Sequence, residues 1–253
     1  MRPIFAIGDL ATARKFLRAK HVLMSFAYWG TTWLRDMDKH AHEFASLVID
    51  CGAFTTWNRE QSGKAPQGVI TLETYADFLK WEAPAHEWAL SLDVIGNAQA
   101  SLDQYIALVE LMRQPREEGG AILMPPERKI VPIYHEGDPI EHLDAYCSMA
   151  DIVAVGRIEG RRSKTSSFEF YDLIFNRFPD RLFHALGNSS PETLEPYPFA
   201  FFDSTGWQRN AGYSNALGWP YNRCSRETRI VAHIEAIETI SYKPTGQLTL
   251  KLT

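Results

Sequence analysis

Short apolar runs alternate with stretches of helical periodicity along most of the chain. The runs are continuous rather than alternating, which is typical of strands that are buried on both faces in a parallel sheet. They predict strands at residues 22–28, 48–50, 88–94, 129–135, 151–157, 181–187 and 199–203. Helical patterns lie between them, at residues 9–20, 32–45, 71–81, 99–113, 140–149, 168–177 and 225–240.

This alternation predicts a single α/β domain over residues 1–253, and the length favours a TIM-type (β/α)8 barrel. Seven strand–helix units are recognisable, and the eighth strand is either the Ile4–Ile7 stretch or the segment near Ala216. A flavodoxin-like open sheet is the alternative fold. Loops are expected at 57–68, 114–128 and 206–223, and the tail at 242–252 alternates like a hairpin or edge strand.

Three of the predicted strands end in an aspartate. Asp203 closes an apolar run and small residues follow it at once, Asp50 repeats this design, and Asp93 is a looser third version. A carboxylate without partners inside an apolar strand is costly, so each should lie at the end of its strand. In a β/α barrel these ends share one face, where the catalytic groups lie. We therefore expect the three to meet in one pocket, although a turn or helix-capping role is the simpler alternative for each.

Other strand ends add polar groups to the same predicted face. They are His135, Gly156 with Arg157, and Gly187, whereas we interpret His184 as a histidine of the core or behind the site. Several carboxylates without a metal-ligand pattern favour covalent or acid/base chemistry at an electron-poor carbon, such as the anomeric carbon of a glycoside. A further carboxylate suits the N–H edge of a guanine-like base. This chemistry requires no metal and no cofactor.

Composition limits the binding partners and the cellular compartment that fit this chemistry. The net charge of −5 argues against a surface that is basic all over, so nucleic acid would need a local basic face. Three widely spaced cysteines argue against a disulfide framework and fit a reducing compartment. No apolar run approaches the roughly 18 residues that a membrane span needs, and the N-terminus lacks an apolar stretch of signal-peptide length. We expect a cytoplasmic protein without a membrane partner.

The strand ends also form an ordered set of motifs. Asp-Cys-Gly-Ala-Phe stands at 50–54, Phe-Asp-Ser at 202–204 with Arg-Asn-Ala at 209–211, and Ala-Val-Gly-Arg at 154–157. The set resembles the tRNA-guanine transglycosylase superfamily, especially its short phage and bacterial branch, which exchanges guanine in DNA for a 7-deazaguanine. The family carries an Asp-Ser-Gly-Gly-Phe motif, a Phe-Asp-Cys motif and a base-recognising Gln where this chain has His135. The resemblance covers roughly residues 20–220.

Carried over residue by residue, the resemblance implies a role for each aspartate. Asp203 would attack C1′ as the nucleophile and Asp50 would act as general acid/base. Asp93 and the backbone at Gly156 would read the edge of the heterocycle. A cyano- or formamidino-type 7-deazaguanine would be the incoming base, and the host cytoplasm the location if the chain is phage-encoded.

The chain departs from the tRNA enzymes of the family in one large feature. Their Cys-x-Cys-x-x-Cys…His zinc site near the C-terminus is missing here, where only Cys224 occurs. This departure favours DNA as the substrate, with the same exchange on tRNA as the alternative. Two further functions fit the same residues: a non-catalytic nucleic-acid-binding barrel, and a glycoside hydrolase that acts on a small nucleoside or sugar.

Basic residues lie among aromatic ones after two of the predicted strands. Arg161, Arg162 and Lys164 follow the strand that ends at Gly156, and Trp207 and Arg209 follow Asp203. Such segments suit phosphate contacts and base stacking, so these five residues are predicted to bind nucleic acid. An ordinary solvated surface is the alternative.

Overall fold

The computed structural model describes residues 1–28, 36, 39–63, 70–83, 86–125, 129–157, 164–208 and 224–243. Within these ranges nine parallel strands form one sheet, in the order β7-β4-β3-β2-β1-β11-β10-β9-β8. Their bounds are β1 Arg2–Ile7, β2 His21–Ser25, β3 Ser46–Asp50, β4 Trp88–Leu90, β7 Lys129–Val131, β8 Ile133–His135, β9 Ile152–Gly156, β10 Leu182–Ala185 and β11 Phe201–Ser204.

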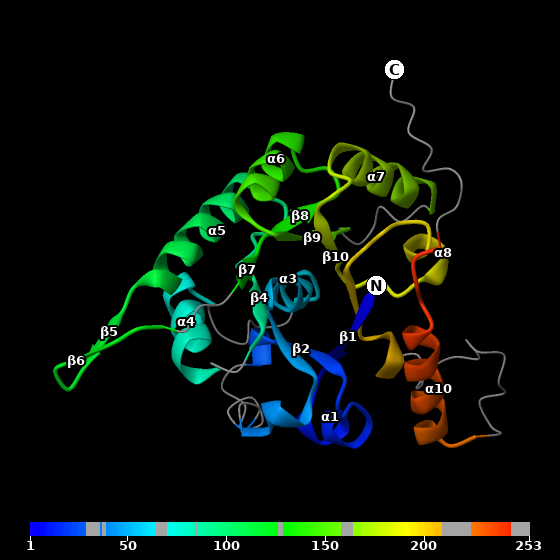
Figure 1. Cartoon of the computed structure of the whole chain (residues 1–253), viewed down its shortest axis with the longest axis horizontal. Coiled ribbons are helices and arrows are strands. Elements are labelled where there is room, and N and C mark those ends of the chain that lie inside the picture. The colour runs from blue at the N-terminus through cyan, green and yellow to red at the C-terminus, as the bar shows by residue number, and fades with distance from the viewer. Residues whose placement is uncertain are drawn as a thin grey trace.

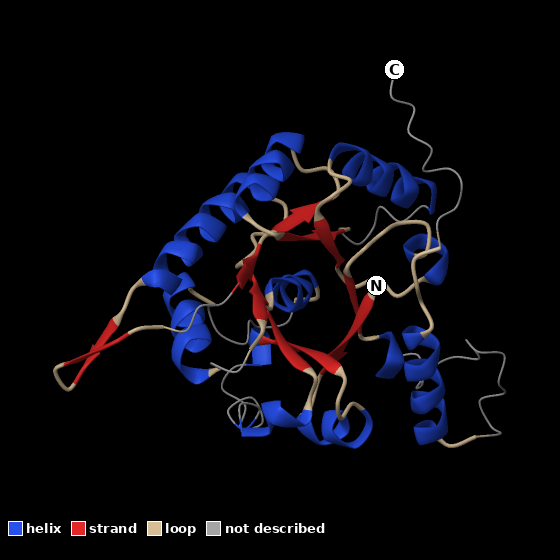
Figure 2. Ribbon diagram, in the orientation of Figure 1, coloured by secondary structure: helices blue, strands red, loops and turns tan. Residues whose placement is uncertain are grey.

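The two ends of this order belong to one segment of the chain, and the sheet therefore closes. β7 and β8 are separated only by Pro132, which has no backbone N–H to donate, while its carbonyl accepts a hydrogen bond from the amide of Ala154 at 2.9 Å. β7 pairs with β4 and β8 pairs with β9, so the segment joins both sides of the ring. Figure 2 shows the strands as a closed ring with helices around it. The predicted (β/α)8 barrel is confirmed and the open flavodoxin-like sheet is excluded.

The N-terminal stretch supplies the eighth strand. β1 lies between β2 and β11 with parallel register on both sides, Phe5 opposite Val22 and Ile4 opposite Asp203. The prediction that Ile4–Ile7 closes the ring is thus correct. The competing segment near Ala216 lies outside the described residues.

Helices surround the ring (Figure 1). Side-chain oxygens cap several of them at the N-terminus, as at Asp9, Thr71, Asn97 and Ser225, where they accept backbone N–H bonds that the helix leaves open. The helices are α1 Leu10–Phe16, α3 Ala53–Gln61, α4 Leu72–Asp77, α5 Ala98–Arg113, α6 Ile140–Met149, α7 Lys164–Arg177, α8 Pro191–Leu194 and α10 Arg226–Glu238, with a π-helical turn Phe78–Glu82 after α4 and 3-10 turns at Phe26–Tyr28 and Ala41–Glu43. None of the described helices is long and apolar enough to cross a membrane.

Helix α3 corrects the first part of the loop predicted at 57–68, since it extends to Gln61; residues 64–68 lie outside the described residues. It begins directly after Gly52, whose φ of +85° turns the chain away from β3. The helix is drawn within the ring of strands in Figure 2, and because it starts at the carboxyl end of β3 it lies across that end of the barrel. It has no fully buried residue, so it lacked the apolar stripe that would have predicted a helix.

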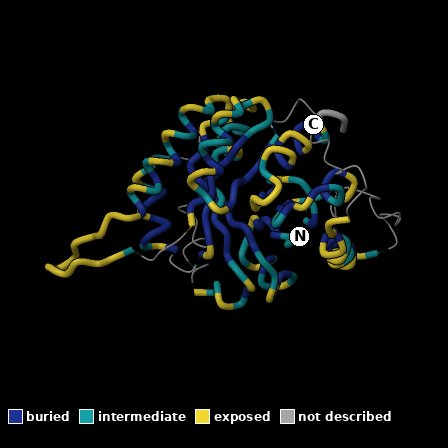
Figure 3. The backbone as a smooth tube through the Cα atoms, turned by 45° about the horizontal axis from the view of Figure 1, so that its top comes forward, coloured by how far each residue is buried: buried dark blue, intermediate teal, exposed yellow. Residues whose placement is uncertain are grey.

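The loop predicted at 114–128 also contains regular structure. Strands β5 (Arg116–Glu118) and β6 (Ala121–Leu123) form an antiparallel hairpin that projects from the barrel (Figures 1 and 3). Gly119 and Gly120 join them with φ values of +58° and +83°, which suits a two-residue turn between twisted strands. Of the helix predicted at 32–45 the structure describes residues 36 and 39–45, and this part ends in the 3-10 turn Ala41–Glu43, so that Phe44 and Ala45 are not helical. Most of the tail predicted at 242–252 lies outside the described residues.

The core lies along the strands of the barrel, which Figure 3 shows largely in dark blue. The strands are buried almost throughout, both inside the ring and against the helices. Between α7 and the β10–β11 side of the barrel lies an aromatic cluster of Tyr171, Phe175, Tyr197 and Phe199, with ring centroids 4.9 to 6.3 Å apart. The cluster packs α7 against the segment that leads into β11.

Candidate active site at the carboxyl end of the barrel

The three predicted aspartates lie at the carboxyl end of the barrel. Asp50 ends β3, Asp93 follows β4, and Asp203 belongs to β11. The pKa of Asp50 is raised to about 6: burial is the largest cause and the negative charges of Asp203 and Asp93 add to it, while hydrogen bonds from Ser25 and Gly52 act in the opposite direction. Because their charges act on Asp50, Asp203 and Asp93 lie near it at this end of the barrel.

A tight turn holds Asp50 in place. The backbone amide of Gly52 donates to Asp50 Oδ2 at 3.1 Å. A side chain at residue 52 would strike the next strand end, because its Cβ would lie 2.6 Å from the amide nitrogen of Ala27. Only glycine allows both this approach and a φ of +85°.

Asp203 is anchored through a single oxygen. Its Oδ1 accepts a hydrogen bond from His184 Nε2 at 2.8 Å and another from the amide of Gly187 at 2.9 Å. The side chain of Asp203 is 10% exposed, whereas that of His184 is fully buried. Among the described residues both bonds fall on Oδ1, so Oδ2 is the oxygen left to act on a substrate.

Asp93 is engaged through both of its oxygens. Oδ1 accepts from Ser101 Oγ at 2.8 Å, and Oδ2 is bonded to His135 Nε2 at 2.8 Å. Burial lowers the pKa of His135, but the hydrogen bond and charge of Asp93, with the charge of Asp138, outweigh it and raise the pKa overall. His135 therefore favours its protonated, donating form beside Asp93.

The remaining predicted strand-end residues support these groups. A Cβ at Gly156 would lie 3.1 Å from His135 Nδ1, so this glycine makes room for the imidazole. The amide of Gly187 serves Asp203. Arg157 Nε donates to Glu136 Oε2 at 2.7 Å and its Nη1 to Ser167, so the guanidinium has protein partners.

One of the predicted nucleic-acid contacts is wrong. Trp207 is fully buried, its Nε1 donates to the carbonyl of Ala6 at 2.9 Å, and its ring meets Phe5 edge-on, so it is a core residue that closes β11 against β1. Lys164 begins α7. Arg161, Arg162 and Arg209 lie outside the described residues, so their predicted role stays a prediction.

His184, interpreted from the sequence as a histidine of the core or behind the site, is buried and bonds Asp203 from behind. One feature of the site was not predicted from the sequence. On α3, Phe54 and Trp57 stack with ring centroids 6.1 Å apart, and Phe54 is 44% exposed. The spacing of three residues on a helix could have revealed this pair, had the segment been predicted as helical.

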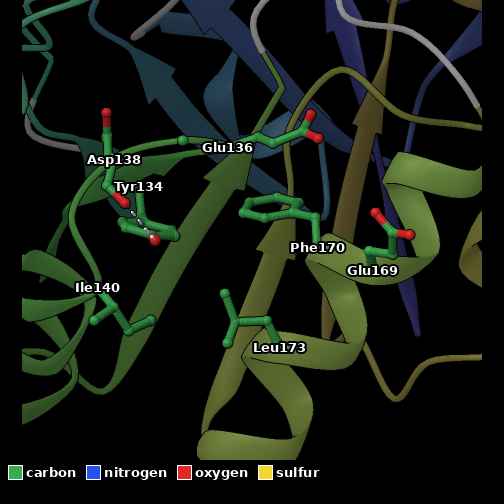
Figure 4. A pocket seen from close by; sticks show the side chains of 8 residues that line it. Tyr134, Glu136, Asp138, Ile140, Glu169, Phe170 and Leu173 are labelled. Atoms are coloured by element: carbon green, nitrogen blue, oxygen red, sulfur yellow. Dashed lines mark hydrogen bonds between the residues drawn. The ribbon is translucent and has the colours of Figure 1, made fainter.

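A separate pocket lies on the outer side of β8, with a volume of about 280 Å³ (Figure 4). It is lined by Tyr134, Glu136 and the α7 residues Phe170 and Leu173, among others. Successive side chains of a strand point to opposite faces, so Tyr134 faces away from the side that His135 takes. None of the three aspartates lines this pocket, and it has no part in the site described above.

Comparison with known proteins identifies the fold. No protein-family model matches the chain, and no curated protein matches it. Several solved structures match the chain. One is a mutant tryptophan synthase alpha-subunit from the hyperthermophile Pyrococcus furiosus, with a TM-score of 0.51 and 12% sequence identity. The match covers 93% of this chain and 96% of that one. KGPDC from Streptococcus mutans is similar with a TM-score of 0.51 and 9% identity, over 94% and 97%. At such identities the likeness shows the TIM-barrel fold alone.

Proposed function

We propose that the barrel is a base-exchange glycosyltransferase that replaces guanine in DNA with a 7-deazaguanine derivative, through a covalent bond between Asp203 and the sugar. The observation that carries the proposal is the contrast between two neighbouring carboxylates at the carboxyl end of the barrel. Asp203 is anchored by Oδ1 and presents Oδ2, while the pKa of Asp50 is raised to about 6. A fixed nucleophile beside a group that exchanges protons near neutral pH is what glycosyl transfer requires.

In the first step Asp203 Oδ2 attacks C1′ of the target nucleotide. The new bond joins C1′ to Oδ2, the C1′–N9 bond breaks, and its electron pair leaves with the purine. Asp50, in its acid form, gives its proton to the departing guanine, which leaves as the neutral base. The sugar stays on the enzyme as an ester of Asp203, so no cofactor has to store the energy of the glycosidic bond.

The second step runs the same chemistry with a different base. The N9–H of the 7-deazaguanine gives its proton to the carboxylate of Asp50, and N9 attacks C1′. The ester bond from C1′ to Oδ2 breaks and Asp203 recovers its charge. Asp50 returns to its acid form, so both groups are ready for the next exchange.

Polymer binding requires that the target base leave the stack of its duplex. The aromatic pair Phe54 and Trp57 lies on α3, across the end of the barrel where the aspartates meet. An exposed ring there offers a stacking surface for a base taken out of the helix. We assign the N–H edge of that base to Asp93, held by His135 and Ser101, because each of its oxygens accepts one bond within the protein and keeps a second lone pair.

The test is incorporation of a labelled 7-deazaguanine into either DNA or tRNA by the purified protein. We expect label in DNA, released guanine in equal amount, and no exchange by D203N. Label in tRNA alone would replace the DNA proposal by the same chemistry on tRNA. Release of guanine from free nucleosides without any polymer would favour the hydrolase, and binding without exchange the non-catalytic barrel.

A further inference from the structure

Strand register brings the buried His184 to Asp203. β10 and β11 run parallel with His184 opposite Phe201. Because side chains alternate along a strand, Phe201 and Asp203 point to the same side. His184 is opposite Phe201, so it is the diagonal neighbour of Asp203, which lies two residues further along β11. The imidazole therefore reaches the carboxylate from behind, at 2.8 Å from Nε2 to Oδ1.

Aromatic rings fix the orientation of this imidazole. Trp88, on β4, meets it edge-on with centroids 5.3 Å apart, and Phe201 lies nearly parallel to it at 6.4 Å. A carboxylate only accepts, so Nε2 carries the proton of the hydrogen bond. The other nitrogen, Nδ1, is buried without a hydrogen-bond partner among the described residues.

We propose that His184 is a positioning residue that acts through Asp203: its Nε2–H, with the amide of Gly187, holds Oδ1 so that Oδ2 points at C1′ of the substrate. The inference rests on the proposed function for its consequence, although the hydrogen bond itself can be tested without any reaction. The two donors also mark Oδ1 as the oxygen that stays bound while Oδ2 forms the ester. The carboxylate thus needs no rotation between the two steps.

The kinetic test compares two substitutions at residue 184. H184M keeps a chain of similar length without a donor, and H184Q keeps an N–H donor. We expect H184M to slow single-turnover adduct formation about 100-fold with little change in the KM for the incoming base, because misplacement of a nucleophile costs turnover rather than binding. H184Q should recover at least about tenfold of that loss. H233Q, in the buried face of α10, is the matched control and should behave as the wild type.

A spectroscopic experiment tests the bond between His184 and Asp203 without a measurement of activity. In the 15N spectrum of the wild type, the His184 imidazole should show a protonated Nε2 and a bare Nδ1, and D203N should shift the Nε2–H signal. Finding the proton on Nδ1, or a signal indifferent to D203N, would overturn the assignment even if H184M fails to fold. Two kinetic results would also overturn it: a folded H184M that forms adduct within about threefold of the wild-type rate, or an H184Q that forms adduct no faster than a folded H184M.

A failure of the proposed function can be distinguished from a failure of the positioning role of His184. If the wild type forms no adduct with DNA or tRNA, the proposed function fails, while the 15N spectrum still reports on the bond between His184 and Asp203. If adduct forms and the spectrum shows the wrong tautomer, the function stands and the positioning role falls.

Discussion

Two aspartate–histidine pairs lie at the same end of the barrel, and they differ in which carboxylate oxygens are hydrogen-bonded and in which member is exposed. Asp203 is held through Oδ1 alone and His184 behind it is fully buried. Asp93 has both oxygens bonded, one by Ser101 and one by His135, and this histidine is 13% exposed. In the first pair the carboxylate is the more exposed member, whereas in the second pair it is the histidine.

The contrast shows that residue type alone does not decide which carboxylate is the nucleophile. Both are strand-end aspartates with a histidine at 2.8 Å. A carboxylate that is hydrogen-bonded on both oxygens is a weaker nucleophile than one with an oxygen that accepts no bond, although each oxygen of Asp93 keeps a second lone pair for recognition. We therefore assign attack to Asp203 and base recognition to Asp93 with His135.

The largest expected effect separates the two aspartates directly. D203N should lower the exchange rate by about 10⁴-fold or more, because it removes the nucleophile. D93N should lower it by only about 10- to 100-fold, because Asn still accepts from Ser101 while His135 is displaced. Steady-state incorporation of labelled base measures both. Equal losses in the two variants would erase the distinction between the pairs.

Asp50 lies between the two pairs, and its ionisation should cost stability. Its pKa is about 6 in the folded chain against an ordinary value of 3.8, so this contribution to stability is fully present below pH 3.8 and is lost as the pH rises through about 6. D50N should therefore raise the unfolding free energy at about pH 8 by up to about 3 kcal/mol and change it little near pH 4. Urea unfolding at both values measures this.

The same experiment ranks the neighbours of Asp50. Asp203 raises the pKa of Asp50 more than Asp93 does. The pH-dependent gain from D50N should accordingly shrink more in a D203N background than in a D93N background. The reverse order would place Asp50 nearer to the second pair.

A comparison of two glycines with almost equal φ separates the effect of the close contact at residue 52, in the turn that holds Asp50, from the effect of the backbone conformation. Gly52 and Gly96 have φ values of +85° and +84°, but a Cβ at 52 would lie 2.6 Å from backbone while one at 96 would meet nothing within 4 Å. G52A should cost about 2 kcal/mol more than G96A in thermal or urea unfolding. Equal costs would mean that the contact with Ala27 relaxes freely.

The smallest effect concerns the second pair alone. G156A would place a Cβ 3.1 Å from His135 Nδ1, which obliges the imidazole to shift by a few tenths of an ångström. We expect the KM for the incoming base to rise about tenfold with little change in the rate of adduct formation, because Asp203 is untouched. A loss confined to adduct formation would instead tie His135 to the chemistry of the first pair.

The fold and the three aspartates were predictable because each depends on a short local pattern. Continuous apolar runs revealed the buried strands, and a charge at the end of such a run can only lie at the barrel mouth. The same logic located His135, and length favoured the closed barrel. Even the eighth strand at Ile4–Ile7 was one of only two choices.

What the sequence left open depends on tertiary contacts. Trp207 looked like a surface aromatic because it stands beside Arg209, yet β1 covers it completely. Helix α3 lacked an apolar stripe because it crosses the open end of the barrel and buries no residue fully. The role of His184 follows from the register of β10 on β11, which no single-strand pattern contains.

The most direct test of the central claim is to trap the covalent intermediate and locate it. Wild-type protein incubated with guanine-containing DNA and no incoming base should carry a sugar–DNA adduct, and peptide mass spectrometry should place it on Asp203. An adduct on Asp50 or Asp93, or exchange that proceeds in D203N, would contradict the assignment of the nucleophile to the aspartate with the free oxygen.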